Sequence, residues 1–246
     1  MNRKSPCRCS PIFEMYCDLL EAYGAQGWWP FDGSHHEQNG TDPRFEIMAG
    51  AILTQNTNWK NVERALKNLK LKNMLCAESL LSAPLQQVAE LIRPSGYYNQ
   101  KAARLVELSR HIMNVCLGDM DLFFCRDTRE LRRELLSING IGPETADSIL
   151  LYAGKKPVFV VDAYTKRLCY RLPLPIVRDD YETIRSYFES ELSRHAQGDE
   201  LTAIFNEFHA LIVKNAKEHC RARSLCEGCP LERICNFSKQ EQNLSR

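Results

Sequence analysis

The spacing of apolar residues is helical along most of the chain. Apolar residues recur every three or four positions, as on one face of a helix, at Ile47 and Ala51, at Val62, Leu66 and Leu69, at Leu105, Leu108 and Ile112, and at Leu131 and Leu135. The one β-like run, residues 157–161 (PVFVV), has no second strand to pair with, so we expect an extended connector there. The pattern therefore predicts an all-α protein.

Breaks in this pattern divide the chain. Gly, Pro and Asn concentrate at residues 24–42, 94–99 and 172–179, where we expect loops. Residues 45–154 predict one compact helical bundle. Neither flank is able to close a core alone, so we expect residues 1–44 and 155–246 to form a second helical domain together.

Composition and charge narrow the class of protein. The 246 residues are 44% hydrophobic and 26% charged, which excludes a disordered, fibrous or collagen-like chain. No apolar stretch reaches the roughly eighteen residues of a membrane span, and the first twenty residues lack a signal-peptide core, so we expect a soluble cytoplasmic protein. Lys and Arg number 32 against 31 Asp and Glu, so a nucleic-acid site must be a local patch.

Four of the eleven cysteines form a cluster with the spacing C-x5-C-x2-C-x5-C, at Cys220, Cys226, Cys229 and Cys235. In a reducing compartment such a group binds metal, and four thiolates suit zinc or an iron–sulfur cluster. A zinc site usually has two C-x2-C pairs and this loop, residues 220–235, has one, which favours a cubane cluster. The other cysteines are scattered; we expect Cys7 and Cys9 to be exposed and the rest, Cys17, Cys76, Cys116, Cys125 and Cys169, to be buried.

A helical hairpin is predicted around Gly140 and Gly142, in the run LLSINGIGPETA. Pro143 suits the first turn of a new helix, and two glycines leave backbone N–H groups accessible, so the turn is able to hold a phosphate without a lysine. The alternative is an ordinary turn between helices. Some twenty residues later, Asp162 follows an apolar run and precedes a helical stretch, a position typical of a helix N-cap. A carboxylate there is also able to stabilise a developing sugar cation or help to activate water.

The hairpin, the run VVDAYTKR and the four cysteines together resemble the endonuclease III superfamily of helix-hairpin-helix DNA glycosylases, over roughly residues 45–236. One interval between cysteines is one residue shorter than in that family. The resemblance implies two helical domains with DNA between them, a [4Fe-4S] cluster on the four cysteines and Asp162 as the catalytic carboxylate. Such enzymes flip a damaged nucleotide out of double-stranded DNA and remove its base.

Two comparisons within the superfamily bear on the substrate. Endonuclease III itself has a catalytic lysine where this chain has Glu144, and a carboxylate cannot form the Schiff base of lyase chemistry. Mismatch-specific adenine glycosylases have a glutamate where this chain has Gly50, five residues before Gln55; Glu46 is one turn away. The 3-methyladenine glycosylase branch is the more similar, which implies a base pocket of Trp28, Trp29, Pro30 and Trp59, with Gln55 and Asn56 beside the vacated position in the duplex.

The sequence thus predicts a monofunctional DNA glycosylase that removes alkylated purines, such as 3-methyladenine, in base excision repair. We expect it to act as a monomer on DNA in the cytoplasm, associated with the nucleoid. One alternative is a bifunctional endonuclease III-type enzyme with lyase activity on oxidised pyrimidines, in which Lys214 or Lys217 supplies the amine. The other is a DNA-damage-binding module without chemistry.

Overall fold

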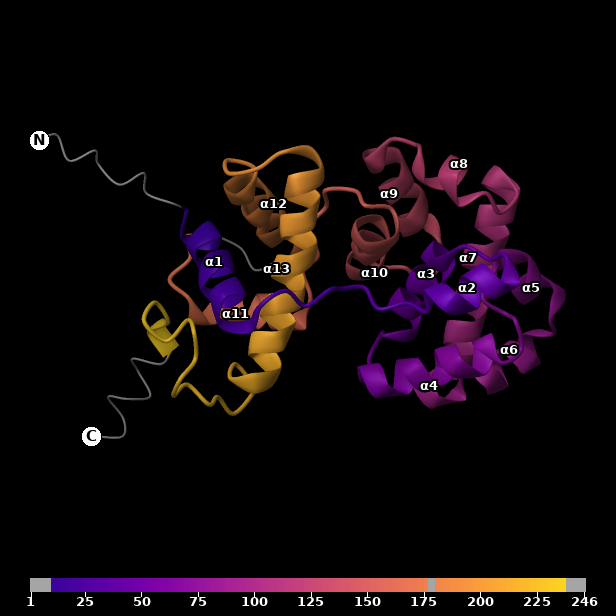
Figure 1. Ribbon diagram of the computed structural model, residues 1–246, viewed down its shortest axis with the longest axis horizontal. Helices are drawn as coiled ribbons and strands as arrows, with labels where there is room; N and C mark the ends of the chain where they lie inside the picture. Colours follow the sequence, from indigo (N-terminus) through magenta and orange to yellow (C-terminus); the bar gives the residue numbers. More distant parts are fainter. Residues whose placement is uncertain (1–9, 177–179, 238–246) are drawn as a thin grey trace, which may run out of the picture. The chain divides into compact units, whose positions relative to one another are not determined.

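The computed structural model describes residues 10–176 and 180–237, so Cys7 and Cys9 lie outside the described residues. Within these ranges the secondary structure is helical and includes no strand, which confirms the predicted all-α class. The chain divides into two compact units, residues 29–156 and residues 1–28 with 157–246. Figure 1 labels the α-helices along the sequence.

In the unit of residues 29–156 most of the other helices pack on two of them, Pro43–Leu53 and Tyr98–Cys116. Its elements are α2 (Gly33–Asn39), α3 (Pro43–Leu53), α4 (Trp59–Lys70), α5 (Ala77–Ser82), α6 (Leu85–Leu91), the 3-10 turn Arg93–Ser95, α7 (Tyr98–Cys116), α8 (Met120–Phe124), α9 (Thr128–Ser137), α10 (Pro143–Ser148) and the π-helical turn Ile149–Ala153. Helices α5 and α6 pack on α7, and α3 packs on α4, α7 and α10. Every residue of α3 from Phe45 to Leu53 is buried, because neighbours cover all of its faces.

The second unit joins the two ends of the chain. It consists of α1 (Pro11–Tyr23), α11 (Ala163–Arg171), α12 (Tyr181–Leu192) and α13 (Gly198–Glu218), and α13 lies beside both α1 and α11 (Figure 1). Its core contains Phe159, whose ring stacks on Phe188 at a centroid distance of 4.7 Å. Residues 158–161 are buried and extended, and the Phe159 amide donates to Glu189 Oε1 over 2.9 Å. The connector predicted at PVFVV is therefore confirmed.

The division between the units lies at residue 28, whereas the sequence placed it at residue 44. Residues 29–44 belong to the bundle because polar contacts bind them to it. His36 Nε2 lies 2.8 Å from Glu46 Oε2, and Lys70 Nζ lies 3.4 Å from Asp32 Oδ2. The expected loop at 24–42 is correspondingly wrong for Gly33–Asn39, which is α2, with the Asp32 side chain accepting from the His35 amide at 3.1 Å.

The scattered cysteines differ in exposure. Cys116 is buried, Cys76 and Cys169 are partly buried, and Cys17 and Cys125 are exposed, so the expectation of burial is wrong for the last two. Cys17 lies on α1 between the buried residues Met15 and Leu19, and Cys125 follows α8 as its C-cap. In the part of the chain that the structure describes, no helix has the length and apolar character to span a bilayer.

Candidate active site and DNA interface

Asp162 is the N-cap of α11, as its sequence position predicted. Its Oδ1 accepts from the Thr165 amide at 2.7 Å and from the Thr165 hydroxyl at 2.9 Å, and the residue is only 9% exposed. Its other oxygen, Oδ2, lies 3.6 Å from Nε2 of His209, a contact slightly longer than a hydrogen bond. Asp162 is thus held by a cap on one oxygen and faces an imidazole with the other.

The pKa of Asp162 is lowered from its ordinary value. Burial alone would raise it, but nearby His209 and the two donors of Thr165 favour the ionised form more strongly. The side chain is therefore a carboxylate at neutral pH. A buried carboxylate is able to stabilise positive charge that develops on a neighbouring sugar, or to orient a water molecule.

The hairpin predicted at residues 140–142 is present between α9 and α10. Gly140 has a φ of +86°, a left-handed conformation that favours glycine. Gly142 is the N-cap of α10, has an ordinary φ of −91°, and has open space where a Cβ would lie. Of the two glycines, only Gly140 is required by backbone conformation.

Gln55 is bonded to this hairpin. Its Nε2 donates to Gly140 O at 3.1 Å and to the Thr145 hydroxyl at 2.8 Å, while its Oε1 accepts from Arg104 on α7. To fill a gap in a duplex, as the sequence suggested, Gln55 would have to exchange these bonds for bonds to DNA. Asn56, the next residue, is exposed and has a φ of +53°.

The predicted aromatic residues fall into two groups, one in each unit. Trp29 lies edge-on to Trp59 at 5.4 Å between centroids and contacts Tyr152 at 5.0 Å, within the unit of residues 29–156. Trp59 begins α4 and does not lie in a loop, because Asn58 caps that helix. Exposed Pro30 follows Trp29 directly.

Trp28 belongs to the other unit. Its ring lies edge-on to His209 at 5.9 Å between centroids, so one imidazole contacts both Trp28 and Asp162. The sequence alone does not select His209, because it is 47 positions from Asp162 and nothing in its local pattern separates it from a core histidine. Tyr152 was not predicted, because it lies in the apolar run Ile149–Ala153. This run forms a π-helical turn, and such turns often occur at functional sites.

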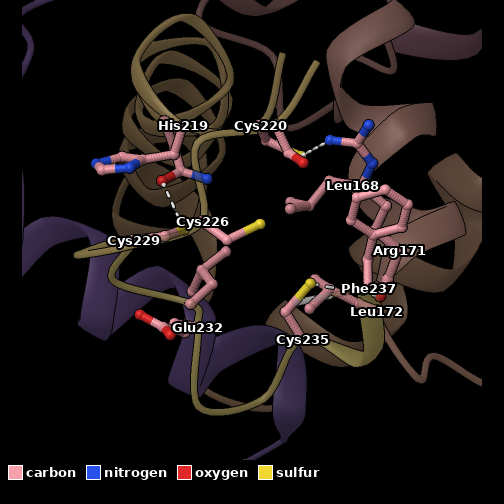
Figure 2. A pocket seen from close by; sticks show the side chains of 13 residues that line it. Leu168, Arg171, Leu172, His219, Cys220, Cys226, Cys229, Glu232, Cys235 and Phe237 are labelled. Carbon is pink, nitrogen blue, oxygen red and sulfur yellow. Dashed lines mark hydrogen bonds between the residues drawn. The ribbon is translucent and has the colours of Figure 1, made fainter. Parts of the chain in front are cut away.

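The four predicted cysteine ligands surround one pocket after α13 (Figure 2). Leu168, Leu172, Leu231 and Phe237 supply apolar walls. Arg171 Nη1 donates to Cys220 Sγ at 3.1 Å, and the Arg171 carbonyl lies 3.6 Å from Cys235 Sγ. Four thiols that line one apolar pocket, with a guanidinium directed at sulfur, supply the donor types that an iron–sulfur cluster takes. The thiols are not close enough together here to count as a metal-binding group: among the described residues, no three His, Cys, Asp or Glu side chains are grouped as the ligands of a metal ion would be.

These features agree with the comparisons to known proteins. The model of the HhH-GPD superfamily of base excision DNA repair proteins matches residues 49–194, and the chain belongs to this family. It is 44% identical over 225 residues to the DNA repair glycosylase MJ1434 of Methanocaldococcus jannaschii, whose name is provisional; the match covers 91% of this chain and 95% of that one. Endonuclease III of Thermotoga maritima is 30% identical over 211 residues, which are 85% of this chain and 89% of that enzyme.

Two solved structures are similar in fold. The H. pylori 3-methyladenine DNA glycosylase MagIII bound to 1,N6-ethenoadenine has a TM-score of 0.68 and 32% identity, covering 84% of this chain and 97% of MagIII. A trapped covalent intermediate of endonuclease III with DNA has a TM-score of 0.71 and 21% identity, covering 94% of this chain and 97% of that one. The second likeness shows the shared helical fold alone.

Proposed function

We propose that the protein is a monofunctional DNA glycosylase that hydrolyses the N-glycosidic bond of alkylated purines in double-stranded DNA. The observation that carries the substrate class is the aromatic group of Trp29, Trp59 and Tyr152. An alkylated purine is electron-poor or cationic, and aromatic faces attract such a base by stacking and cation–π forces of about 1 to 3 kcal/mol per base. The 32% identity to a 3-methyladenine glycosylase supports the same class.

Four residues support hydrolysis without a covalent intermediate. Asp162 supplies a buried carboxylate, whereas the position of the endonuclease III lysine is Glu144, which is exposed. Lys101, a buried lysine of the same unit as the hairpin, donates to the carbonyls of Leu53 and Ser95 and serves the backbone. Lys214, considered above as an alternative amine, pairs with Glu218.

The test is release of bases from DNA treated with a methylating agent, with Asp162→Asn as the inactive comparison. We expect the wild-type protein to release methylated purines and D162N to bind the same DNA without releasing them. Release of oxidised pyrimidines alone, with borohydride-trapped adducts on abasic DNA, would establish the bifunctional alternative. Binding to damaged DNA with no excision of any lesion would establish a binding module.

We propose further that Cys220, Cys226, Cys229 and Cys235 hold a [4Fe-4S] cluster and that this cluster has a structural role. When bound, the cluster would tie the loop of residues 220–235 to α11 and α13. The chain's own contribution is the thiolate set, the apolar walls and the Arg171 guanidinium beside Cys220 Sγ. Iron and sulfide analysis decides between this cluster and zinc, and Cys229→Ser should release the metal and lower the melting temperature, whereas Cys125→Ser should do neither.

A further inference from the structure

We propose that His209 is a positioning residue that orients the Asp162 carboxylate and couples it to Trp28; this inference rests on the proposed function. His209 lies in the middle of α13, is 4% exposed, and faces α11, on which α13 packs. Its Nε2 lies 3.6 Å from Asp162 Oδ2, and the Trp28 ring meets the imidazole edge-on. One side chain therefore contacts both the proposed catalytic carboxylate and a residue predicted for the base pocket.

The two oxygens of Asp162 have different surroundings. Both donors of Thr165 bond to Oδ1, which fixes that oxygen in the N-cap of α11. Oδ2 is the oxygen that faces the imidazole. A carboxylate held at one oxygen is still able to tilt about that oxygen, so a second contact is needed to set the direction of Oδ2. His209 supplies that contact from a different helix.

The contact with His209 matters because the Asp162 carboxylate is buried. Moving a carboxylate out of water is costly unless polar groups compensate for the lost hydration. His209 on α13 acts together with Thr165 of α11 to lower the pKa of Asp162, and the imidazole is itself buried. Substitution of His209 should leave the N-cap intact, because the cap consists of the hydrogen bonds from Thr165 to Oδ1, while the orientation of Oδ2 is lost.

The contact with Trp28 gives His209 a second effect. An edge-on aromatic pair has a preferred geometry, so the imidazole also restricts the Trp28 indole. If Trp28 contacts the excised base, as its sequence position suggests, His209 sets the relation between that ring and the carboxylate within one rigid unit. Its substitution should then lower the rate of base release more than the affinity for DNA.

Two substitutions separate these contributions. His209→Gln places an amide N–H near the position of Nε2, whereas His209→Phe retains a ring against Trp28 and has no polar atom. Single-turnover release of methylpurine and binding to an abasic-site duplex are measured for both. We expect H209F to slow release by about tenfold to a hundredfold with DNA binding changed less than about twofold, and H209Q to recover most of the rate.

Different results would contradict the proposed substrate and the proposed role of His209. If wild-type protein releases no methylpurine, the proposed substrate is wrong, and the variants are compared on whichever lesion the wild type excises. If H209F matches the wild-type rate on the excised lesion, the role of His209 is wrong. Should H209F fail to fold, as judged by thermal melting, H209Q is compared with His209→Asn, whose shorter amide does not reach Oδ2. Equal rates for Gln and Asn would overturn the proposal.

Discussion

Trp29 occupies the space beside Gly50 on α3. A Cβ on residue 50 would lie 3.1 Å from Nε1 of the Trp29 indole and 3.3 Å from Cζ2, tighter than ordinary van der Waals contact. The resemblance to the superfamily implies that Gly50 stands where mismatch-specific adenine glycosylases have a glutamate. In the structure, the absence of a side chain at Gly50 leaves room for the Trp29 indole, which contacts Trp59 and Tyr152.

We therefore expect Gly50→Glu to displace Trp29 and disrupt the aromatic group. Release of methylpurine should fall by about tenfold or more, because stacking of about 1 to 3 kcal/mol per base is lost. The matched control is Gly50→Ala, whose single methyl requires Trp29 to move by only a few tenths of an ångström, so most activity should remain. Excision assays and near-ultraviolet circular dichroism check both variants. An active G50E protein with unchanged aromatic signals would contradict this account of Gly50.

The two hairpin glycines should respond differently to alanine. At Gly140 the φ of +86° is left-handed, and a Cβ would collide with the Arg104 side chain, so Gly140→Ala strains the backbone and pushes Arg104 away from Gln55. We expect a loss of about 1 to 2 kcal/mol in the free energy of unfolding. At Gly142 the space is open, and Gly142→Ala should change stability by less than about 0.5 kcal/mol.

Urea unfolding measures the stability of both variants, and titration of an abasic-site duplex measures their affinity for DNA. Strain at Gly140 should shift the hairpin backbone and also the Gln55 side chain, which donates to Gly140 O. If backbone amides of the hairpin bind phosphate, G140A should therefore also weaken DNA binding. Equal stabilities for G140A and G142A would show that the left-handed turn is not a constraint.

Local sequence predicted the features that depend on neighbours in the chain. The helix-breaking pair around Gly140 and the N-cap at Asp162 are set by backbone conformation within a few residues. The contact of Asp162 with His209 and the place of Trp29 beside Gly50 depend on how helices pack, which no local pattern contains. Helix α2 was not predicted, because its sequence, GSHHEQN, has no apolar period. The helix is stabilised instead by the Asp32 cap and by the contact of His36 with Glu46.

Glu144 offers a test of the lyase chemistry that the sequence disfavours. If the hairpin is built as in endonuclease III, Glu144→Lys places an amine where that enzyme has its catalytic lysine. We expect borohydride to trap E144K on abasic-site DNA, and to trap neither the wild type nor Glu144→Gln. The readout is a covalent adduct on a denaturing gel. Trapping of the wild-type protein would mean that another amine, such as Lys214 or Lys217, reaches the sugar, and the monofunctional assignment would be wrong.

Lys101 gives the bundle a pH dependence at the alkaline end. The side chain is 1% exposed and donates to Leu53 O at 2.8 Å and Ser95 O at 2.7 Å. Burial, with a smaller effect from the charge of Arg104, lowers its pKa from 10.5 to about 8. A neutral amine still has two N–H groups, enough for both carbonyls. Deprotonation therefore removes the cost of a buried charge without breaking these hydrogen bonds.

The direction of the effect follows from proton binding. Between pH 8 and 10.5 the unfolded chain holds a proton that the folded protein has released, so the free energy of unfolding rises with pH across that window. Relative to Lys101→Met, which cannot titrate, the wild type should gain up to about 3 kcal/mol between pH 7.5 and 10.5, at about 1.4 kcal/mol per pKa unit. Other groups that titrate in this range cancel in the comparison. Urea unfolding at several pH values measures the gain, with the exposed Lys67→Met as control. A difference between wild type and K101M that stays flat or shrinks as the pH rises would show that Lys101 keeps its charge in the folded protein.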